Sequence, residues 1–182
     1  ALEITEQEAV IAEEQKEKIK ISDLVKRLIE QVAFEARASE FVDKKSGVSA
    51  RLTISAFENA VSAAERRSIV NNEKETQVWL SDLAGIIPSI TGKIELVYEG
   101  EQEGPYQVAM NLVDRSIRTQ FIQYFPNPDN LKKRSGRKGD TPEVVENPYR
   151  SIIGWFDKGN HINLFFGNTD RDKINLLYKV DG

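Results

Sequence analysis

Apolar residues recur at helical spacing along most of the chain, and the clearest run covers residues 23–39. They fall three and four positions apart, which predicts one buried helix face. This face consists of Leu24, Val25, Leu28, Ile29, Val32, Ala33 and Ala36. Ser22 precedes the run and favours the N-cap position, because its hydroxyl can accept a hydrogen bond from an unpaired amide at the helix start. The pattern therefore predicts an amphipathic helix that begins next to Ser22.

A second long helix is expected from about residue 50 to residue 70. Its predicted core face consists of Ile54, Phe57, Val61 and Ala64. Ser49 is the expected N-cap, and the neighbouring Asn71 and Asn72 are the expected terminators. Arg66 and Arg67, near the far end of this helix, are interpreted as solvated charges.

The N-terminal segment, residues 4–18, is also expected to be helical. Thr5 and Glu8 have the spacing of a capping box, in which each side chain satisfies an amide near the helix start. The segment is acidic at first and Lys-rich towards its end, a distribution that suits the helix dipole.

The middle of the chain has weaker signals. Alternating residues predict an extended run over residues 76–80, and Ser81 is a candidate N-cap for a helix that begins at Asp82. Pro88 is expected to kink or restart that helix. Residues 93–98 fit either an extended segment or the tail of the helix.

In the C-terminal half, the glycine-broken acidic stretch 98–104 is predicted to be a loop. Pro105 suits the first position of a new helix, whose apolar residues continue to Phe125. Shorter helices are expected over residues 148–158 and, after the N-cap Thr169, over residues 170–179.

Two apolar groups in this half need a place to pack. They are Trp155-Phe156 and Leu164-Phe165-Phe166. The favoured interpretation is the core of a small C-terminal subdomain, and the alternative is a docking surface.

Composition excludes several classes of site. The chain has 182 residues, with 25 Lys and Arg, 29 Asp and Glu, one His and no Cys. Without Cys, a disulfide framework, a thiolate nucleophile and a Cys-ligated metal are excluded, and one His excludes a multi-His site within a chain. No apolar run approaches the roughly 20 residues that span a bilayer. This composition is typical of a cytoplasmic protein.

No complete catalytic motif is present. The P-loop pattern G-x-x-x-x-G-K-[ST], whose backbone amides cradle phosphates, is absent. Paired carboxylates such as Glu13-Glu14 and Glu101/Glu103 lie in polar runs, where nothing would desolvate them and shift their pKa values. They are therefore expected on solvated faces, and His161 is expected to be structural.

A basic block at residues 132–138 follows Phe121, Tyr124 and Phe125 in the sequence. Lys and Arg neutralise phosphates and aromatic rings stack on bases, so this combination is compatible with nucleic-acid binding. The aromatics, however, fall on a helical stripe that is more typical of a core, and the net charge of the chain is −4. A flexible solvated loop over residues 129–147 is the favoured interpretation.

Residues 42–67, VDKKSGVSARLTISAFENAVSAAERR, resemble the C-terminal helical lid of AAA+ ATPases in the branch of MoxR-like proteins and the magnesium-chelatase ATPase subunit. Gly47-Val48-Ser49-Ala50-Arg51 is similar to the G-x-S-x-R that opens the sensor-2 helix of that branch. SDLAGIIPSITGKIEL, residues 81–96, resembles the closing lid helix. The lid resemblance covers residues 20–97, and the rest is similar only to a bacterial group labelled magnesium-chelatase subunit I-like.

The resemblance implies that Arg51 is a sensor-2-like residue that contacts a nucleotide phosphate, with ATP and Mg²⁺ as cofactors of a larger parent protein. The P-loop, the Walker B acid and sensor 1 are expected upstream of Ala1. The chain alone is therefore expected to lack catalytic residues and bound cofactors. The implied partners are the P-loop domain, further copies in a ring and a von Willebrand factor A-domain protein.

The expected fold is mainly α. Residues 1–97 would form the lid-like helical domain, including the N-terminal helix 4–18, and residues 98–182 a mainly helical extension. Neither a membrane nor nucleic acid is expected as a partner. The competing interpretation is a stand-alone helical protein-interaction module with no nucleotide role.

Overall fold

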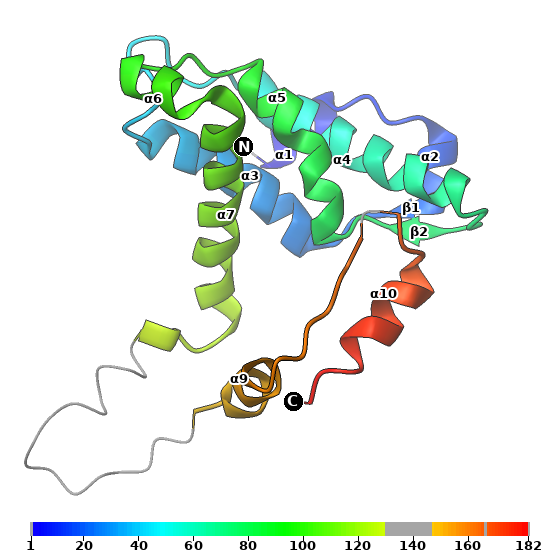
Figure 1. Ribbon diagram of the computed structural model, residues 1–182. Helices are drawn as coiled ribbons and strands as arrows, with labels where there is room; N and C mark the ends of the chain where they lie inside the picture. Colours follow the sequence, from blue (N-terminus) through cyan, green and yellow to red (C-terminus); the bar gives the residue numbers. More distant parts are fainter. Residues whose placement is uncertain (1, 130–146, 166, 182) are drawn as a thin grey trace, which may run out of the picture.

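The computed structural model describes residues 2–129, 147–165 and 167–181, and the fold is mainly helical with one small two-stranded sheet (Figure 1). The elements are α1 (Leu2–Glu8), α2 (Glu13–Lys18), β1 (Ile19–Lys20), α3 (Asp23–Ala38), α4 (Arg51–Val70), β2 (Thr76–Gln77), the 3-10 helix η1 (Leu80–Ile86), α5 (Ile87–Thr91), α6 (Tyr98–Glu103), α7 (Pro105–Tyr124), α9 (Arg150–Asp157) and α10 (Asp170–Leu177). The mainly α fold class is therefore confirmed.

The hydrophobic core lies between α3, α4, η1, α5 and α7. Helix α3 packs against both α4 and α7, and α4 also packs against η1 and α5. Helix α7 contributes Val108, Ala109, Leu112 and Val113 to this core. Residues on both sides of position 97 thus share one core, so the division expected between residues 97 and 98 does not coincide with a break in packing.

The two long helices form largely as the sequence predicts. The hydroxyl of Ser22 accepts a hydrogen bond from the amide of Val25 at 3.3 Å, which caps α3. Every residue of the predicted α3 face is buried except Leu24, which is 37% exposed. Helix α4 ends at the C-cap Asn71, and Asn72 follows in the left-handed region with φ of 52°.

The N-terminal segment differs from its prediction. Two helices, α1 and α2, replace the single helix 4–18. Thr5 lies inside α1, where it is buried and donates a hydrogen bond to the hydroxyl of Thr53 at 2.8 Å. The capping-box prediction was wrong, because Thr5 lies in the interior of α1 and its hydroxyl bonds Thr53.

The extended run predicted at residues 76–80 is shorter and pairs with a distant segment. Strands β1 and β2 are parallel, with Ile19 opposite Thr76. Helix η1 then begins at Leu80 rather than at Asp82, and α5 restarts the helix with Pro88 in its first turn. Residue Leu96 forms an antiparallel bridge with Val42, so the extended alternative for residues 93–98 applies there.

The loop prediction for residues 98–104 was wrong, because residues 98–103 form α6. Gly100 is buried, and a Cβ atom at this position would lie 2.5 Å from the carbonyl oxygen of Phe41. The glycine therefore permits a close approach of two backbone segments rather than breaking the helix. Pro105 is the first residue of α7, as predicted.

Helices α9 and α10 form close to their predicted positions, but α9 buries no residue. Phe156 is 45% exposed and Phe165 is 66% exposed, so the interpretation of these aromatics as a subdomain core was wrong. Figure 1 shows α9 apart from the helices of the core and α10 beside the small sheet. Most of the predicted loop 129–147, with its basic block, and Phe166 lie outside the described residues.

Among the helices that the structure describes, none is both long enough and apolar enough to cross a membrane.

Candidate functional site

Arg51 is the first residue of α4, and its side chain is exposed. The hydroxyl of Ser49 accepts a hydrogen bond from the Arg51 amide at 3.2 Å, while the carbonyl of Ser49 accepts one from Leu52 at 3.0 Å. The N-cap of α4 is Ala50, so the predicted N-cap was one residue too early, and Ser49 contacts the first turn from the position before it. Within the described parts of the chain, the guanidinium of Arg51 makes no ion pair, so it remains available to an external anion.

The loop before α4 is fixed by Asp43. Its carboxylate accepts a hydrogen bond from the amide of Lys45 at 2.8 Å, and its carbonyl accepts one from Gly47 at 3.2 Å. The amide of Asp43 donates to the carbonyl of Glu95 at 2.8 Å, and the hydroxyl of Ser46 contacts the Glu95 carboxylate. Gly47 has φ of 70°, a conformation that favours glycine. These contacts hold the loop that leads into Arg51 against the segment that precedes α6.

A shallow pocket of about 340 Å³ lies beside this loop. Its lining consists of Arg37, Val42, Asp43, Lys44, Gly47 and Val48. Arg37 also lines a smaller neighbouring pocket together with Ala50, and its guanidinium carbon lies 5.8 Å from the centroid of the Phe34 ring. The first pocket thus combines two exposed cations, Arg37 and Lys44, with the carboxylate of Asp43, and Arg51 lines neither pocket.

The side chains that could bind a metal do not form a cluster within the described residues. No set of three or more His, Asp or Glu side chains among residues 2–129, 147–165 and 167–181 could hold a metal ion. His161 is exposed, as are Glu13, Glu14, Glu101 and Glu103, so the carboxylate pairs lie on solvated faces.

The opposite end of α4 carries a buried charge cluster that sequence reasoning missed. Arg67 was interpreted as solvated, yet it is only 1% exposed, whereas its neighbour Arg66 is exposed. The guanidinium binds Asp82 through two hydrogen bonds, Nε to Oδ1 at 3.1 Å and Nη2 to Oδ2 at 3.0 Å. It also donates to Asp170 at 2.6 Å and to Glu73 at 3.4 Å.

A second buried cation completes this cluster. The ammonium of Lys173 donates to the hydroxyl of Ser81 at 2.9 Å and lies 5.6 Å from the centroid of the Trp79 ring. The indole of Trp79 donates in turn to the carboxylate of Asp170 at 2.6 Å. Within the described residues, no buried side-chain nitrogen or oxygen lacks a hydrogen-bond partner. The cluster is therefore satisfied internally and offers no vacant polar group to a ligand.

Burial and partners move the pKa values of the two cations in opposite directions. Burial works against the charge of Arg67, but its hydrogen bonds and charge interactions with Asp82 and Asp170 outweigh burial and raise its pKa. Burial lowers the pKa of Lys173, and the nearby carboxylates only partly oppose that effect. The environment therefore stabilises the charged form of Arg67 and destabilises the charged form of Lys173.

The helical period could have revealed Arg67. Positions 60, 64 and 67 lie on one face of a helix, and Ala60 and Ala64 are both fully buried. Extending the apolar face by one turn leads to Arg67 and not to Arg66. The two candidate regions, Arg51 and Arg67, are therefore opposite ends of one helix, about 24 Å apart at about 1.5 Å per residue.

Comparison of the chain with protein-family models, with curated proteins and with solved structures finds no match.

Proposed function

We propose that this chain is the nucleotide-sensing lid of a MoxR-like or magnesium-chelatase subunit I-like AAA+ ATPase, which couples ATP hydrolysis to remodelling of a partner. The observation that supports the proposal is the placement of Arg51: it is exposed, and it begins a helix that is anchored in the core. The resemblance of residues 47–51 to a G-x-S-x-R sensor-2 segment gives this placement its interpretation.

The chemistry of Arg51 suits a phosphate contact. A guanidinium keeps its charge at any physiological pH and presents two parallel donors that match two phosphate oxygens. Ser49 already occupies the amide of Arg51, so the side chain makes the contact while the helix dipole adds a favourable field for an anion. Helix α4 is anchored in the core, so a movement of Arg51 on loss of the terminal phosphate would be transmitted through α4 to the helices packed against it.

The proposal divides the work between two domains. A P-loop domain of the same protein would hold ATP and Mg²⁺, and this chain would supply the contact to the terminal phosphate. The parent protein would act as a cytoplasmic ring of identical subunits, with a von Willebrand factor A-domain protein as a possible partner. Neither membrane nor nucleic-acid binding belongs to the proposal, and the isolated chain would not hydrolyse ATP.

The experiment is ATP hydrolysis by the parent protein with Arg51 intact and with Arg51→Ala. Loss of one preorganised donor to a transition-state charge lowers the rate on the order of 100-fold, and we expect a loss of that order. The matched control is Arg66→Ala, which removes an exposed arginine from the far end of the same helix. Equal rates for both variants, or a parent protein without a P-loop, would refute the proposal.

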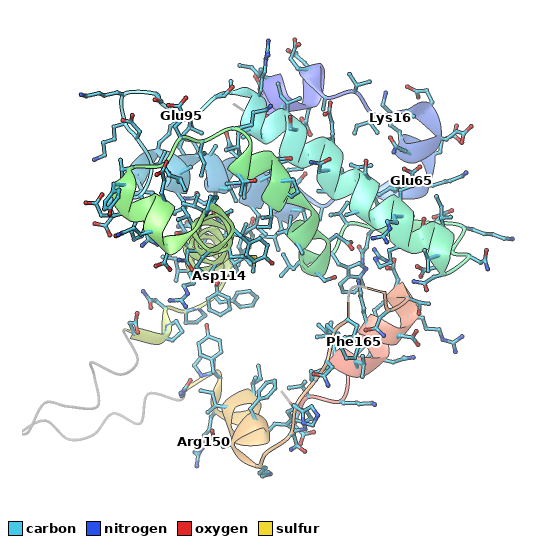
Figure 2. The ribbon with its side chains drawn as sticks, turned by 45° about the horizontal axis from the view of Figure 1, so that its top comes forward. Lys16, Glu65, Glu95, Asp114, Arg150 and Phe165 are labelled. Atoms are coloured by element: carbon cyan, nitrogen blue, oxygen red, sulfur yellow. The ribbon has the colours of Figure 1, made fainter. Side chains whose placement is uncertain are left out.

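One observation favours a second candidate, a helical interaction module with no nucleotide role. Several apolar side chains of the C-terminal part are exposed: Ile152, Ile153, Phe156, Leu164, Phe165, Ile174 and Leu177. Figure 2 shows Phe165 on the segment that joins α9 to α10. A parent protein in which Arg51→Ala has no effect on ATP hydrolysis would favour this module.

A further inference from the structure

Helix α10 is attached to the rest of the protein through polar side chains. Lys173 is its one buried residue, while Ile174 is 40% exposed, Leu177 is 44% exposed and the adjoining Tyr178 is 84% exposed. A helix that packs by the usual means buries its apolar stripe. The position of α10 therefore depends on hydrogen bonds and ion pairs rather than on a hydrophobic interface.

Asp170 provides most of this attachment. Its carboxylate accepts hydrogen bonds from Nη1 of Arg67 at 2.6 Å, from Nε1 of Trp79 at 2.6 Å and from the hydroxyl of Thr76 at 3.0 Å. Its amide donates to the carboxylate of Glu73 at 2.8 Å. Arg67 lies in the last turn of α4, and the other partners lie between the end of α4 and the start of η1.

If α10 detached, no buried ion of the cluster would lose all of its oppositely charged partners. With α10 docked, Arg67 and Lys173 face Asp82, Glu73 and Asp170, which is two positive against three negative charges. Without α10, Arg67 faces Asp82 and Glu73, which is one positive against two negative charges. The net charge is −1 in both cases, and Arg67 keeps its two hydrogen bonds to Asp82.

This balance matters because breaking a buried ion pair is costly chiefly when one partner stays behind unpaired. Here Asp170 and Lys173 leave together and regain water. The segment that precedes α10 is held by contacts at exposed positions: α9 buries no residue, Asn71 donates to the carbonyl of Gly167 at 3.0 Å, and the hydroxyl of Tyr149 donates to the carbonyl of Pro126 at 2.5 Å.

We propose that α10 is a releasable latch: the Asp170–Lys173 face docks on the Arg67–Asp82–Trp79 cluster and detaches while the helical core stays folded. Release uncovers one edge of the Trp79 indole and the Nη1 group of Arg67 at the end of α4. The docked and released states therefore differ in whether these two groups are covered by α10 or exposed to solvent. This inference is independent of the nucleotide role proposed for Arg51, which lies at the other end of the helix.

The test is native-state hydrogen exchange of the whole chain, read at the amides of α10 and at those of α3 and α7. A hydrogen bond to a charged group contributes about 1.5–3 kcal/mol, so its loss raises the opening equilibrium by about tenfold or more. We expect Asp170→Asn to speed exchange in α10 by that factor and to leave α3 and α7 unchanged. Trp79→Phe removes the indole donor from the core side of the contact, and the same result is expected.

Two controls separate the latch from the helix itself. Asp172→Asn changes the other acid of the first turn of α10, whose carboxylate accepts a hydrogen bond from the hydroxyl of the N-cap Thr169 at 2.7 Å and makes none with α4 within the described residues. Trp155→Phe makes the aromatic substitution in α9. Neither control should alter the difference in amide exchange rate between α10 and the core helices α3 and α7. The inference is overturned if α10 exchanges only together with α3 and α7, or if Asp172→Asn loosens α10 as much as Asp170→Asn does.

Discussion

The guanidinium of Arg67 and the carboxylate of Asp82 face each other edge to edge, with both side chains fully removed from solvent. Asp82 has a second task, since its carboxylate also accepts a hydrogen bond from the amide of Trp79 at 2.8 Å and so caps the start of η1. The pair thereby joins the end of α4 to η1 across a stretch of chain that includes β2. It belongs to the core, whereas Asp170 and Lys173 come from the C-terminal end.

The first prediction concerns this pair. Asp82→Asn should lower the free energy of unfolding by about 3–5 kcal/mol, because Arg67 keeps its charge in the interior after its main partner is lost. The measurement is urea-induced unfolding followed by circular dichroism. Asp114→Asn, at an exposed position of α7, is the control and should change stability by less than about 0.5 kcal/mol. A small effect of Asp82→Asn would mean that Glu73 and Asp170 can replace Asp82.

The comparison of sequence and structure shows which interactions leave a local signal. Helix α3 could be predicted closely because Ser22 and the apolar period specify it within one segment. The pairing of Ile19 with Thr76 has no such signal, since each strand has two residues and the contact is non-local. Helix α6 was mistaken for a loop because Gly100 was interpreted as a breaker, whereas it serves a close contact with Phe41.

The two arginines of the candidate sites illustrate the same limit. The position of Arg51 at the start of a helix could be predicted from the nearby Ser49, whose hydroxyl accepts a hydrogen bond from the Arg51 amide. Arg67 could have been placed on the buried face by its helical period, but its partners Asp82 and Asp170 lie 15 and 103 positions away. Charged residues are buried when partners are available, and the partners become visible only in three dimensions.

The second prediction concerns the pH dependence of the latch. Burial lowers the pKa of Lys173 in the docked state, while release restores the ordinary value of 10.5. The docked state therefore binds the proton less tightly, so docking should strengthen as the pH rises through the interval below 10.5. The charges that face the Lys173 ammonium are those of Arg67, Asp82, Asp170 and Glu73.

Trp79 provides the measurement for this pH effect. In a Trp155→Phe background Trp79 is the one tryptophan of the chain, and its quenching by acrylamide should fall as the pH approaches 10.5. The change should disappear in Lys173→Met, which lacks the titrating group, and persist in Lys179→Met, at an exposed position after α10. If quenching changed equally in Trp155→Phe alone and in its combinations with Lys173→Met and Lys179→Met, the titrating group would not be Lys173.

The third prediction tests the close approach at α6. Gly100→Ala should destabilise the protein by about 1–3 kcal/mol, because the added methyl group would meet the Phe41 carbonyl and the Cβ atom of Leu96. Gly154→Ala in α9 is the matched control, since a Cβ at that position would meet no atom within 4 Å apart from its chain neighbours and the adjacent backbone of α9. Alanine there should favour the helix by up to about 1 kcal/mol. Thermal unfolding of the two variants should therefore move in opposite directions.

The last prediction separates a functional role of Arg51 from a structural one. Because its side chain is exposed and its ion pairs are absent among the described residues, Arg51→Ala should change the free energy of unfolding by less than about 0.5 kcal/mol. Urea-induced unfolding of the chain measures this, with Arg66→Ala as the control at the other exposed arginine of α4. A large loss of stability in Arg51→Ala alone would show that the side chain supports the helix start. A fall in ATP hydrolysis by the parent protein would then reflect damage to the fold rather than a lost contact to phosphate.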